Sequence, residues 1–277
     1  MTGVYAPDPA DGKWGALGRL GFIELSTSIA LSAELPSALP PGVTALLTRL
    51  RLPDGEVSVR ALERMVSSSR LEEATRELAD VEVDVVAFAC TTGSLIGGVG
   101  FDRKVIQRME RADGVRATTT STALIAALEA LGARSVGLAT PYIDELNEIE
   151  VSFLRASGFD VKAARGLSVR SDPEIARIPY EHTRELALTV AREAGDADAL
   201  FVSCTNLLTL ALLDPLEREL GIPVISSVAV TIWHALLLAG VTPSATGVGS
   251  LLGGRPGATP GADRLSLATE GSHGDAR

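Results

Sequence analysis

Two short stretches of the 277-residue chain decide the expected fold: residues 84–92 read DVVAFACTT, and residues 198–206 read DALFVSCTN. Each is an apolar run of strand length that ends in Cys-Thr and a small polar residue. The two cysteines of the chain, Cys90 and Cys204, occupy the same place in both stretches. Because continuous apolar runs of this length are typical of strands buried on both faces of a parallel sheet, we interpret them as equivalent strands of an internal repeat.

A second pair of stretches extends the repeat. Residues 114–133 (GVRATTTSTALIAALEALGA) and 221–240 (GIPVISSVAVTIWHALLLAG) each contain a short strand-like run, a Thr/Ser cluster and an apolar helical pattern. A repeat this long, occurring twice, is not that of a solenoid. It predicts two α/β lobes related by a pseudo-twofold axis, with the two Cys-Thr turns facing each other across a cleft that holds the active site.

Strand-like runs alternate with helical patterns along the chain. The expected strands are residues 18–25, 45–52, 83–89, 115–119, 135–140, 161–167, 199–203 and 223–227. The expected helices are residues 61–80, 121–131, 143–156, 179–194, 213–220 and 229–239. This alternation is typical of βαβ units and predicts, in each lobe, a small parallel sheet of about four strands flanked by helices.

The same patterns suggest the domain boundaries. We expect residues 16–120 with 228–242 to form the first lobe, and residues 121–227 to form the second. Residues 1–15 and 243–277 are rich in Gly, Pro and Ala with little periodicity, so we expect flexible tails there, with a short ordered piece near residues 245–252.

Composition excludes several classes of protein. The net charge of −10 argues against binding to nucleic acid, which requires a basic surface. Apolar runs fall short of the ~18–20 residues of a membrane span, and the first residues lack the pattern of a secretory signal. Two cysteines and three histidines without paired spacing do not match the usual zinc sites. We therefore expect a cytoplasmic protein with free thiols, without metal, and without nucleic acid or membrane partners.

Both cysteines are candidate catalytic residues because of their place in the sheet. Ligands of open parallel sheets bind beyond the carboxyl ends of the strands, where Cys90 and Cys204 lie. Backbone N–H groups at a following helix start favour an anion there, and we expect them to lower the pKa of a thiol. Such a pair is able to act as acid and base, or as nucleophile and acid. Alternatively, the cysteines are inert core residues of a protein that binds small anions without catalysis.

Polar residues beside the cysteines are candidates for substrate binding. Thr91, Thr92, Thr205 and Asn206 offer hydroxyls, an amide and backbone N–H groups. These groups suit a substrate carboxylate and the charge that develops on it during reaction. The same residue types also favour ordinary helix capping, so both interpretations remain open.

The chain resembles the aspartate/glutamate racemase superfamily, in the branch of maleate cis–trans isomerase, arylmalonate decarboxylase and the related ectoine-utilisation protein. The matching stretches are ACTTGS (89–94), TSTALIAALEALGARSVGLATPYIDELNE (120–148), SDPEIARI (171–178), DADALFVSCTNLLT (196–209) and GIPVISS (221–227). The resemblance covers about residues 17–242. It implies a two-lobed α/β enzyme that uses neither metal nor organic cofactor, binds a small mono- or dicarboxylate between its lobes and forms a homo-oligomer.

The resemblance also implies roles for individual residues. Cys90 matches the nucleophile or base of the isomerases and Cys204 the acid/base, while Tyr142 matches a tyrosine that donates to the substrate carboxylate. Where the isomerases have a carboxylate-binding asparagine after the first strand, this chain has a run of hydroxyl residues ending in Ser28. We therefore expect a maleate isomerase-like enzyme.

Other activities of the same superfamily remain open. These are an amino-acid or hydantoin-type racemase, an ectoine-catabolism enzyme, and an arylmalonate-type decarboxylase. The decarboxylases have only the second cysteine, so the presence of Cys90 argues against that activity.

Overall fold

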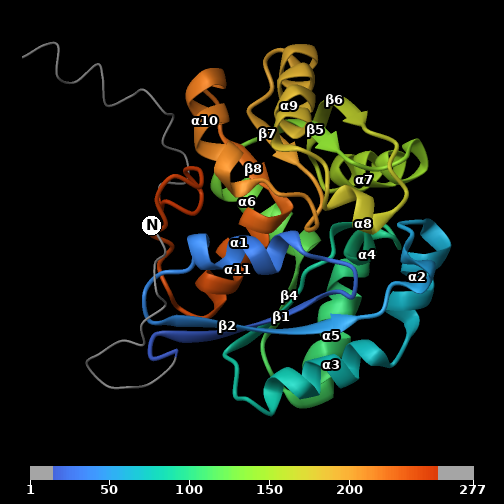
Figure 1. The fold of residues 1–277 in the computed structure, drawn as a ribbon, viewed down its shortest axis with the longest axis vertical. Coiled ribbons are helices and arrows are strands. Elements are labelled where there is room, and N and C mark those ends of the chain that lie inside the picture. Colours follow the sequence, from blue (N-terminus) through green and yellow to red (C-terminus); the bar gives the residue numbers. More distant parts are fainter. Residues whose placement is uncertain (1–14, 255–277) are drawn as a thin grey trace, which may run out of the picture.

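Two four-stranded parallel sheets organise this computed structural model, which describes residues 15–254 (Figure 1). The first sheet has the strand order β2-β1-β3-β4 and the second β6-β5-β7-β8. Their strands are β1 (Gly18–Leu25), β2 (Val43–Leu50), β3 (Val85–Phe88), β4 (Ala117–Thr119), β5 (Ser135–Thr140), β6 (Asp160–Gly166), β7 (Ala199–Val202) and β8 (Val224–Ser226). The shared order confirms the predicted α/β fold of two similar halves.

Helices cover both sheets and lie between them. The helices of the first half, which alternate with its strands along the chain, are α1 (Ala30–Ala38), η1 (Pro53–Gly55), α2 (Val59–Ser67), α3 (Arg70–Ala79), α4 (Thr91–Leu95), α5 (Phe101–Asp113) and α6 (Thr120–Ala130). Those of the second half are α7 (Asp144–Ala156), α8 (Asp172–Ile175), α9 (Tyr180–Ala194), α10 (Leu210–Leu220) and α11 (Ser227–Leu238). Within residues 15–254, no helix combines the length and apolar character needed to cross a bilayer.

The central strands are buried as their composition predicts. All four residues of β3 and all four of β7 are buried, as continuous apolar runs in parallel sheets require. Each pairs with a neighbour in parallel register, β1 with β3 and β5 with β7. The carboxyl ends of β3 and β7, where the cysteines follow, are therefore equivalent positions in the two sheets.

The repeat extends to the helices that join the lobes. Thr119 caps the start of α6, where its side chain accepts from Thr122 N, and Ser226 caps α11 in the same way through Ala229 N. The two helices pack on each other between the sheets, and α11 also packs on β1, β3 and β4. This cross-packing joins the last helix of the second half to the first sheet.

Two expectations about helices were wrong. The single helix predicted at residues 61–80 is divided into α2 and α3. Ser68 is extended (ψ 149°) and its hydroxyl accepts from Arg70 N, because serine side chains compete with the helix for backbone donors. The helices α1 and α5 were not expected. Helix α1 contains Pro36 and lacks a side-chain cap, so its local helix signal is weak.

The ordered piece predicted near residues 245–252, within the predicted C-terminal tail, is confirmed. Of residues 243–277, the structure describes those up to Gly254, and this part is packed on the second lobe. Val248, Leu251 and Leu252 are buried, and the Ser250 backbone N–H and hydroxyl both donate to Glu217 at 2.8 Å. Burial of these apolar side chains overrides the loop-like composition. The predicted N-terminal tail at residues 1–15, apart from Gly15, and residues 255–277 lie outside the described part of the chain.

Candidate active site

Cys90 lies where β3 ends and α4 begins. It has extended backbone angles (φ −149°) and serves as the residue that caps the helix, because its sulfur accepts a hydrogen bond from Gly93 N at 3.3 Å. The Thr92 side chain also hydrogen-bonds to this sulfur. The cysteine side chain is thus held by local helix-start geometry, as the sequence predicted for this position.

Cys204 occupies the equivalent place after β7, in a strained conformation. Its φ of +99° lies in the region that favours glycine, which costs roughly 1–3 kcal/mol for other residues. Two hydrogen bonds hold it there: Cys204 N donates to Ser227 Oγ at 2.9 Å, and Asn206 N donates to the Cys204 sulfur at 3.3 Å. Strain of this kind is characteristic of functional turns.

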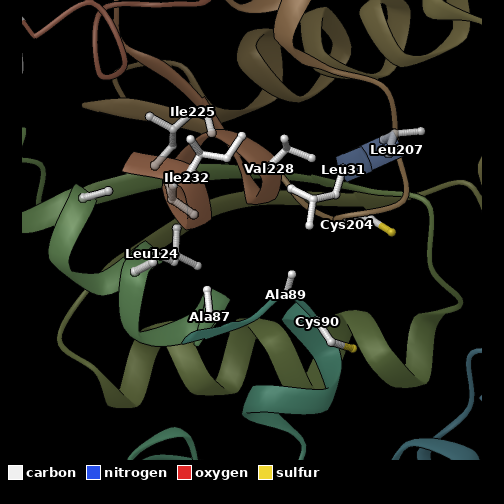
Figure 2. Close-up of a cluster of buried hydrophobic side chains, with 14 of the residues drawn as sticks. Leu31, Ala87, Ala89, Cys90, Leu124, Cys204, Leu207, Ile225, Val228 and Ile232 are labelled. Carbon is white, nitrogen blue, oxygen red and sulfur yellow. The ribbon is translucent and has the colours of Figure 1, made fainter. Parts of the chain in front are cut away.

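The two thiols belong to one site. Figure 2 shows the side chains of Cys90 and Cys204 leaving the apolar cluster on the same side. A negative charge on Cys90 raises the pKa of Cys204, so the sulfurs lie within electrostatic reach of each other. The Tyr142 hydroxyl hydrogen-bonds to the Cys204 sulfur and also senses the charge of Cys90. The predicted residues Cys90, Cys204 and Tyr142 therefore converge.

The backbone at Tyr142 depends on a close approach to the end of β6. The Tyr142 carbonyl accepts from Ser168 N at 3.1 Å. A Cβ added to Gly166 would lie 2.3 Å from that carbonyl oxygen and 2.2 Å from Asn147 Nδ2. Only glycine leaves room for the turn that carries the tyrosine into the site.

Burial keeps both thiols protonated, contrary to the expectation of a lowered pKa. Cys90 is 3% and Cys204 4% exposed. Desolvation raises the pKa of Cys90 to about 12 and raises that of Cys204 further. The backbone N–H groups on the sulfurs lower both pKa values, as predicted, but this effect is smaller than that of burial. The charge of Asp172 opposes ionisation of both thiols as well.

Two of the predicted substrate-binding residues, Thr91 and Thr205, join the lobes through their hydroxyls. The Thr91 hydroxyl donates to Ser227 Oγ at 2.8 Å, and the Thr205 hydroxyl donates to the Ala89 carbonyl at 3.0 Å. Ser227 Oγ accepts hydrogen bonds from both the Thr91 hydroxyl and Cys204 N. The hydroxyls therefore fix the two cysteine turns against each other across the lobes.

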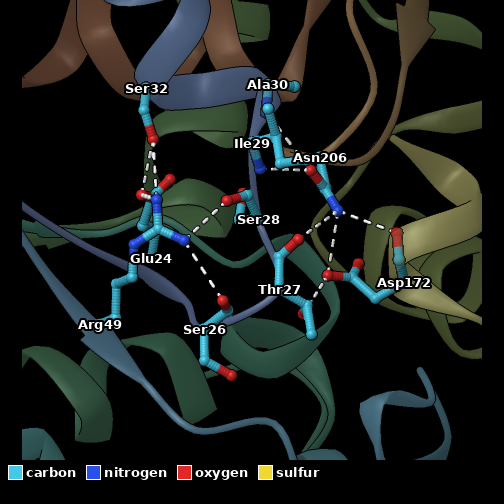
Figure 3. A network of polar contacts seen from close by, with 10 residues as sticks. All are labelled: Glu24, Ser26, Thr27, Ser28, Ile29, Ala30, Ser32, Arg49, Asp172 and Asn206. Atoms are coloured by element: carbon cyan, nitrogen blue, oxygen red, sulfur yellow. Dashed lines mark hydrogen bonds and ion pairs between the residues drawn. The ribbon is translucent and has the colours of Figure 1, made fainter. Parts of the chain in front are cut away.

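Asn206 is likewise committed to protein contacts. Its side-chain oxygen accepts from Ile29 N at 2.7 Å, and its amide nitrogen donates to the backbone carbonyl of Asp172 at 2.9 Å and to Asp172 Oδ2 at 3.0 Å (Figure 3). The Thr27 hydroxyl donates to the same carboxylate oxygen. Asn206 thus holds Asp172 and the turn after β1 beside Cys204.

Ser28 lies in the turn after β1, beside a buried ion pair. Its carbonyl accepts from Arg49 at 2.9 Å, and its side chain lies beside Glu24. Arg49 pairs with the fully buried Glu24 carboxylate at 2.7 Å (Figure 3). The Ser28 backbone N–H donates to the Leu25 carbonyl at 3.0 Å, and the buried Ser28 hydroxyl has no hydrogen-bond partner among the described residues. Thr27, one residue earlier, donates its hydroxyl to Asp172.

Sequence reasoning missed three residues of the site. Asp172 lies in the matching stretch 171–178, but its distance in sequence from the cysteines hid its place. Ser227 ends the short strand-like run of the repeat, and Glu150 reads as one charge of an amphipathic helix. The Glu150 carboxylate is fully buried, accepts from Ser203 Oγ at 2.8 Å and acts electrostatically on Tyr142. Residues 15–254 include no cluster of three or more His, Cys, Asp or Glu that suits a metal ion.

Comparison with known proteins places the chain among enzymes of two activities. The model of the arylmalonate decarboxylase family matches residues 50–252. A maleate isomerase of Nocardia farcinica is 30% identical over 242 residues, which cover 84% of this chain and 95% of the relative. An arylmalonate decarboxylase of Bordetella bronchiseptica is 33% identical over 186 residues, which cover 67% of this chain and 77% of the relative.

Solved structures of the same two kinds of enzyme are similar to this chain. A maleate isomerase from Pseudomonas putida S16, with one cysteine replaced by alanine and with maleate, has a TM-score of 0.81 and 26% identity, covering 87% of this chain and 99% of its own. The Nocardia farcinica enzyme with a covalently bound succinylcysteine intermediate has a TM-score of 0.78 and 29% identity, covering 85% and 98%. An arylmalonate decarboxylase variant with a glycine-to-cysteine and a cysteine-to-serine exchange has a TM-score of 0.78 and 30% identity, covering 84% and 98%. With its family model matched over most of its length, this chain belongs to the arylmalonate decarboxylase family.

Proposed function

We propose that this protein is a cofactor-independent isomerase of small cis-unsaturated carboxylates, similar to maleate isomerase, with Cys90 as nucleophile and Cys204 as acid/base. The observation that carries the proposal is the pair of buried thiols at equivalent strand ends, each with a backbone N–H on its sulfur. The succinylcysteine captured in the Nocardia farcinica enzyme is the adduct that such chemistry forms.

The reaction starts from two neutral thiols. The Cys90 sulfur forms a bond to one alkene carbon, Cys204 gives its proton to the other alkene carbon, and the Cys90 proton passes to Cys204. The former double bond is now a single bond, about which the adduct rotates. Cys204 then gives its proton back to the Cys90 sulfur and takes a proton from the adduct carbon while the S–C bond breaks. These changes give the trans product and restore both thiols.

The groups around the sulfurs stabilise the charge that passes between them. The Cys90 sulfur accepts hydrogen bonds from Gly93 N and the Thr92 side chain. The Cys204 sulfur accepts hydrogen bonds from Asn206 N and the Tyr142 hydroxyl. Hydrogen bonds to a sulfur that carries partial negative charge are stronger than those to a neutral thiol, so they lower the barrier more than they stabilise the resting state.

Proton NMR tests the proposal directly. The protein is incubated in D₂O with maleate, its monoamide maleamate, aspartate, glutamate and phenylmalonate, beside the variants Cys90→Ser, Cys204→Ser and Cys90→Ala. A trans-alkene product that is lost in all three variants supports the mechanism. Absence of any trans product would contradict it.

A second candidate activity is decarboxylation, favoured by the family model and by the 33% identical relative. Cys90 argues against it. The two positions exchanged in the decarboxylase variant are 114 residues apart, as are Cys90 and Cys204, and the first of them is glycine before the exchange. Loss of CO₂ from phenylmalonate that needs only Cys204 would favour this activity. Deuterium entering an α-position would favour a racemase, and no turnover a binding protein.

The remaining parts of the proposal follow the family analogy. They are a small carboxylate as the only partner besides copies of the chain, assembly into a homo-oligomer, and a cytoplasmic location. Light scattering at several protein concentrations tests the assembly, since a single monomeric mass at every concentration would contradict it.

A further inference from the structure

A buried carboxylate stands beside the two thiols. Asp172, the first residue of α8, is 1% exposed. Its Oδ2 accepts from the Thr27 hydroxyl at 2.5 Å and from Asn206 Nδ2 at 3.0 Å (Figure 3). Among the hydrogen bonds of residues 15–254, none involves its Oδ1. One oxygen is therefore fixed to the protein, and the other remains an acceptor for a further donor.

Asp172 belongs to the site by contact and by charge. Asn206, which bonds to its carboxylate, also donates its backbone N–H to the Cys204 sulfur. A negative charge on Asp172 disfavours the thiolates of both Cys90 and Cys204, so the carboxylate acts electrostatically on both sulfurs.

This carboxylate has no cation to neutralise it in the described part of the chain, where none of the ion pairs includes Asp172. The Arg49 guanidinium, on the other side of the turn after β1, is paired with the buried Glu24. The Glu24 carboxylate itself is close enough to Asp172 for the two charges to repel. A second carboxylate of a substrate would thus meet an uncompensated negative charge.

We infer that Asp172 determines specificity: it selects a substrate that carries a carboxylate at one end and a hydrogen-bond donor, an amide or ammonium group, at the end that faces Asp172. The inference rests on the proposed function and narrows it from dicarboxylates to their monoamides or amino-substituted analogues. The donor N–H bonds to Asp172 Oδ1, while a carboxylate in its place presents a like charge.

The size of the preference follows from Coulomb's law. Two like charges about 5 Å apart at an effective dielectric constant of about 20 repel strongly enough to weaken binding by about 300-fold. Proton uptake by the pair reduces this penalty at low pH, because burial already raises the pKa of Asp172. We therefore expect weak binding of the diacid to improve as pH falls from 7.5 to 5.5, and binding of the monoamide to change less.

Asp172→Asn is a sharp test because it keeps the fold contacts. The amide oxygen takes the place of Oδ2 and still accepts from Thr27 and Asn206, and the amide nitrogen takes the place of the free oxygen. The variant thus turns an acceptor into a donor at the substrate side. Asp102→Asn is the matched control, since Asp102 is also buried and accepts from a threonine hydroxyl, Thr122 Oγ1, at 2.6 Å in the first lobe.

Isothermal titration calorimetry with succinate and succinamate, saturated analogues of maleate and maleamate, measures the preference without turnover. We expect the wild type and Asp102→Asn to bind succinamate at least 10-fold more tightly than succinate, and Asp172→Asn to reverse the order. Equal or tighter binding of succinate by the wild type, an unchanged ratio in Asp172→Asn, or no binding of either probe would overturn the inference.

The turnover assay separates this inference from the proposed function. Maleamate isomerised faster than maleate, with the order reversed by Asp172→Asn, supports both. Maleate isomerised by the wild type as fast as maleamate leaves the isomerase activity standing and overturns the specificity of Asp172. Selective binding of succinamate without any isomerisation overturns the activity and supports the selection by Asp172.

Discussion

Replacement of Glu150 by glutamine is expected to make the protein markedly less sensitive to alkaline pH. The Glu150 carboxylate is fully buried, its Oε1 accepts from Ser203 Oγ, and its Oε2 has no hydrogen-bond partner among the described residues. Desolvation raises its pKa to about 8, and the bond from Ser203 offsets only part of that rise. Glutamine keeps an oxygen for Ser203 but carries no charge.

The magnitude follows from proton linkage. The pKa of Glu150 in the folded state, about 8, lies above its unfolded value of 4.5. Between these pH values the folded state binds more protons, so the free energy of unfolding falls by about 1.4 kcal/mol per pH unit as pH rises. Between pH 5.5 and 8.5 the free energy of unfolding of the wild type should therefore fall by about 3 kcal/mol more than that of the glutamine variant.

Urea unfolding at pH 5.5, 7.0 and 8.5 measures this difference. Other groups that titrate in the same range, such as Glu34 with a pKa raised by burial to about 7, contribute equally to both proteins and cancel. Glu145→Gln, on the exposed side of the same helix, is the control and should follow the wild type. A Glu150→Gln curve parallel to the wild type across this range would refute the reasoning, because it would mean that Glu150 is ionised in the fold at pH 5.5.

Three further predictions concern the thiol site. Tyr142→Phe removes the hydrogen bond on the Cys204 sulfur and should lower kcat by about 10- to 100-fold, with the fold intact by circular dichroism. An unchanged kcat would contradict stabilisation of charge on the Cys204 sulfur by Tyr142. Ser227→Ala leaves the buried Cys204 N–H and the Thr91 hydroxyl without their acceptor. It should lower the free energy of unfolding, measured in urea, by about 1–3 kcal/mol. A change below about 0.5 kcal/mol would show that these hydrogen bonds do not hold the turn. The rate at which iodoacetamide alkylates Cys90 in the native protein is measured by mass spectrometry. This rate should rise about tenfold per pH unit from pH 7 to 9, because the pKa of Cys90 is raised to about 12. A rate that reaches a plateau below pH 8 would disprove the raised pKa.

The pattern of residues along the chain was enough to predict the repeat and the positions of the two cysteines. Strands β1 and β5 have the predicted bounds, residues 18–25 and 135–140. Strand β2 begins two residues earlier than predicted, at Val43, because its pairing with β1 starts there. Apolar runs and turn residues act over a few neighbours, so they can be read without knowledge of the fold.

The roles of the polar residues around the cysteines could not be predicted in the same way. Thr91 and Thr205 have the types and places expected for carboxylate binding, yet their hydroxyls bond across the lobes. Asn206 bonds to Asp172 and Ile29, which are 34 and 177 residues away in sequence. A hydroxyl or amide bonds to whichever partner lies nearest in space, and the partner is known only when the lobes are assembled.

What the sequence determined alone is therefore the α/β repeat and the presence of two thiols at equivalent strand ends, since these depend on short-range periodicity. Only the tertiary structure decided the protonation of those thiols and the charge beside them. Backbone N–H groups of the local turn lower the pKa of Cys90, but burial by both lobes and the negative charge of Asp172 raise it more. Desolvation and long-range charge depend on everything that surrounds a group, and that environment exists only in the folded chain.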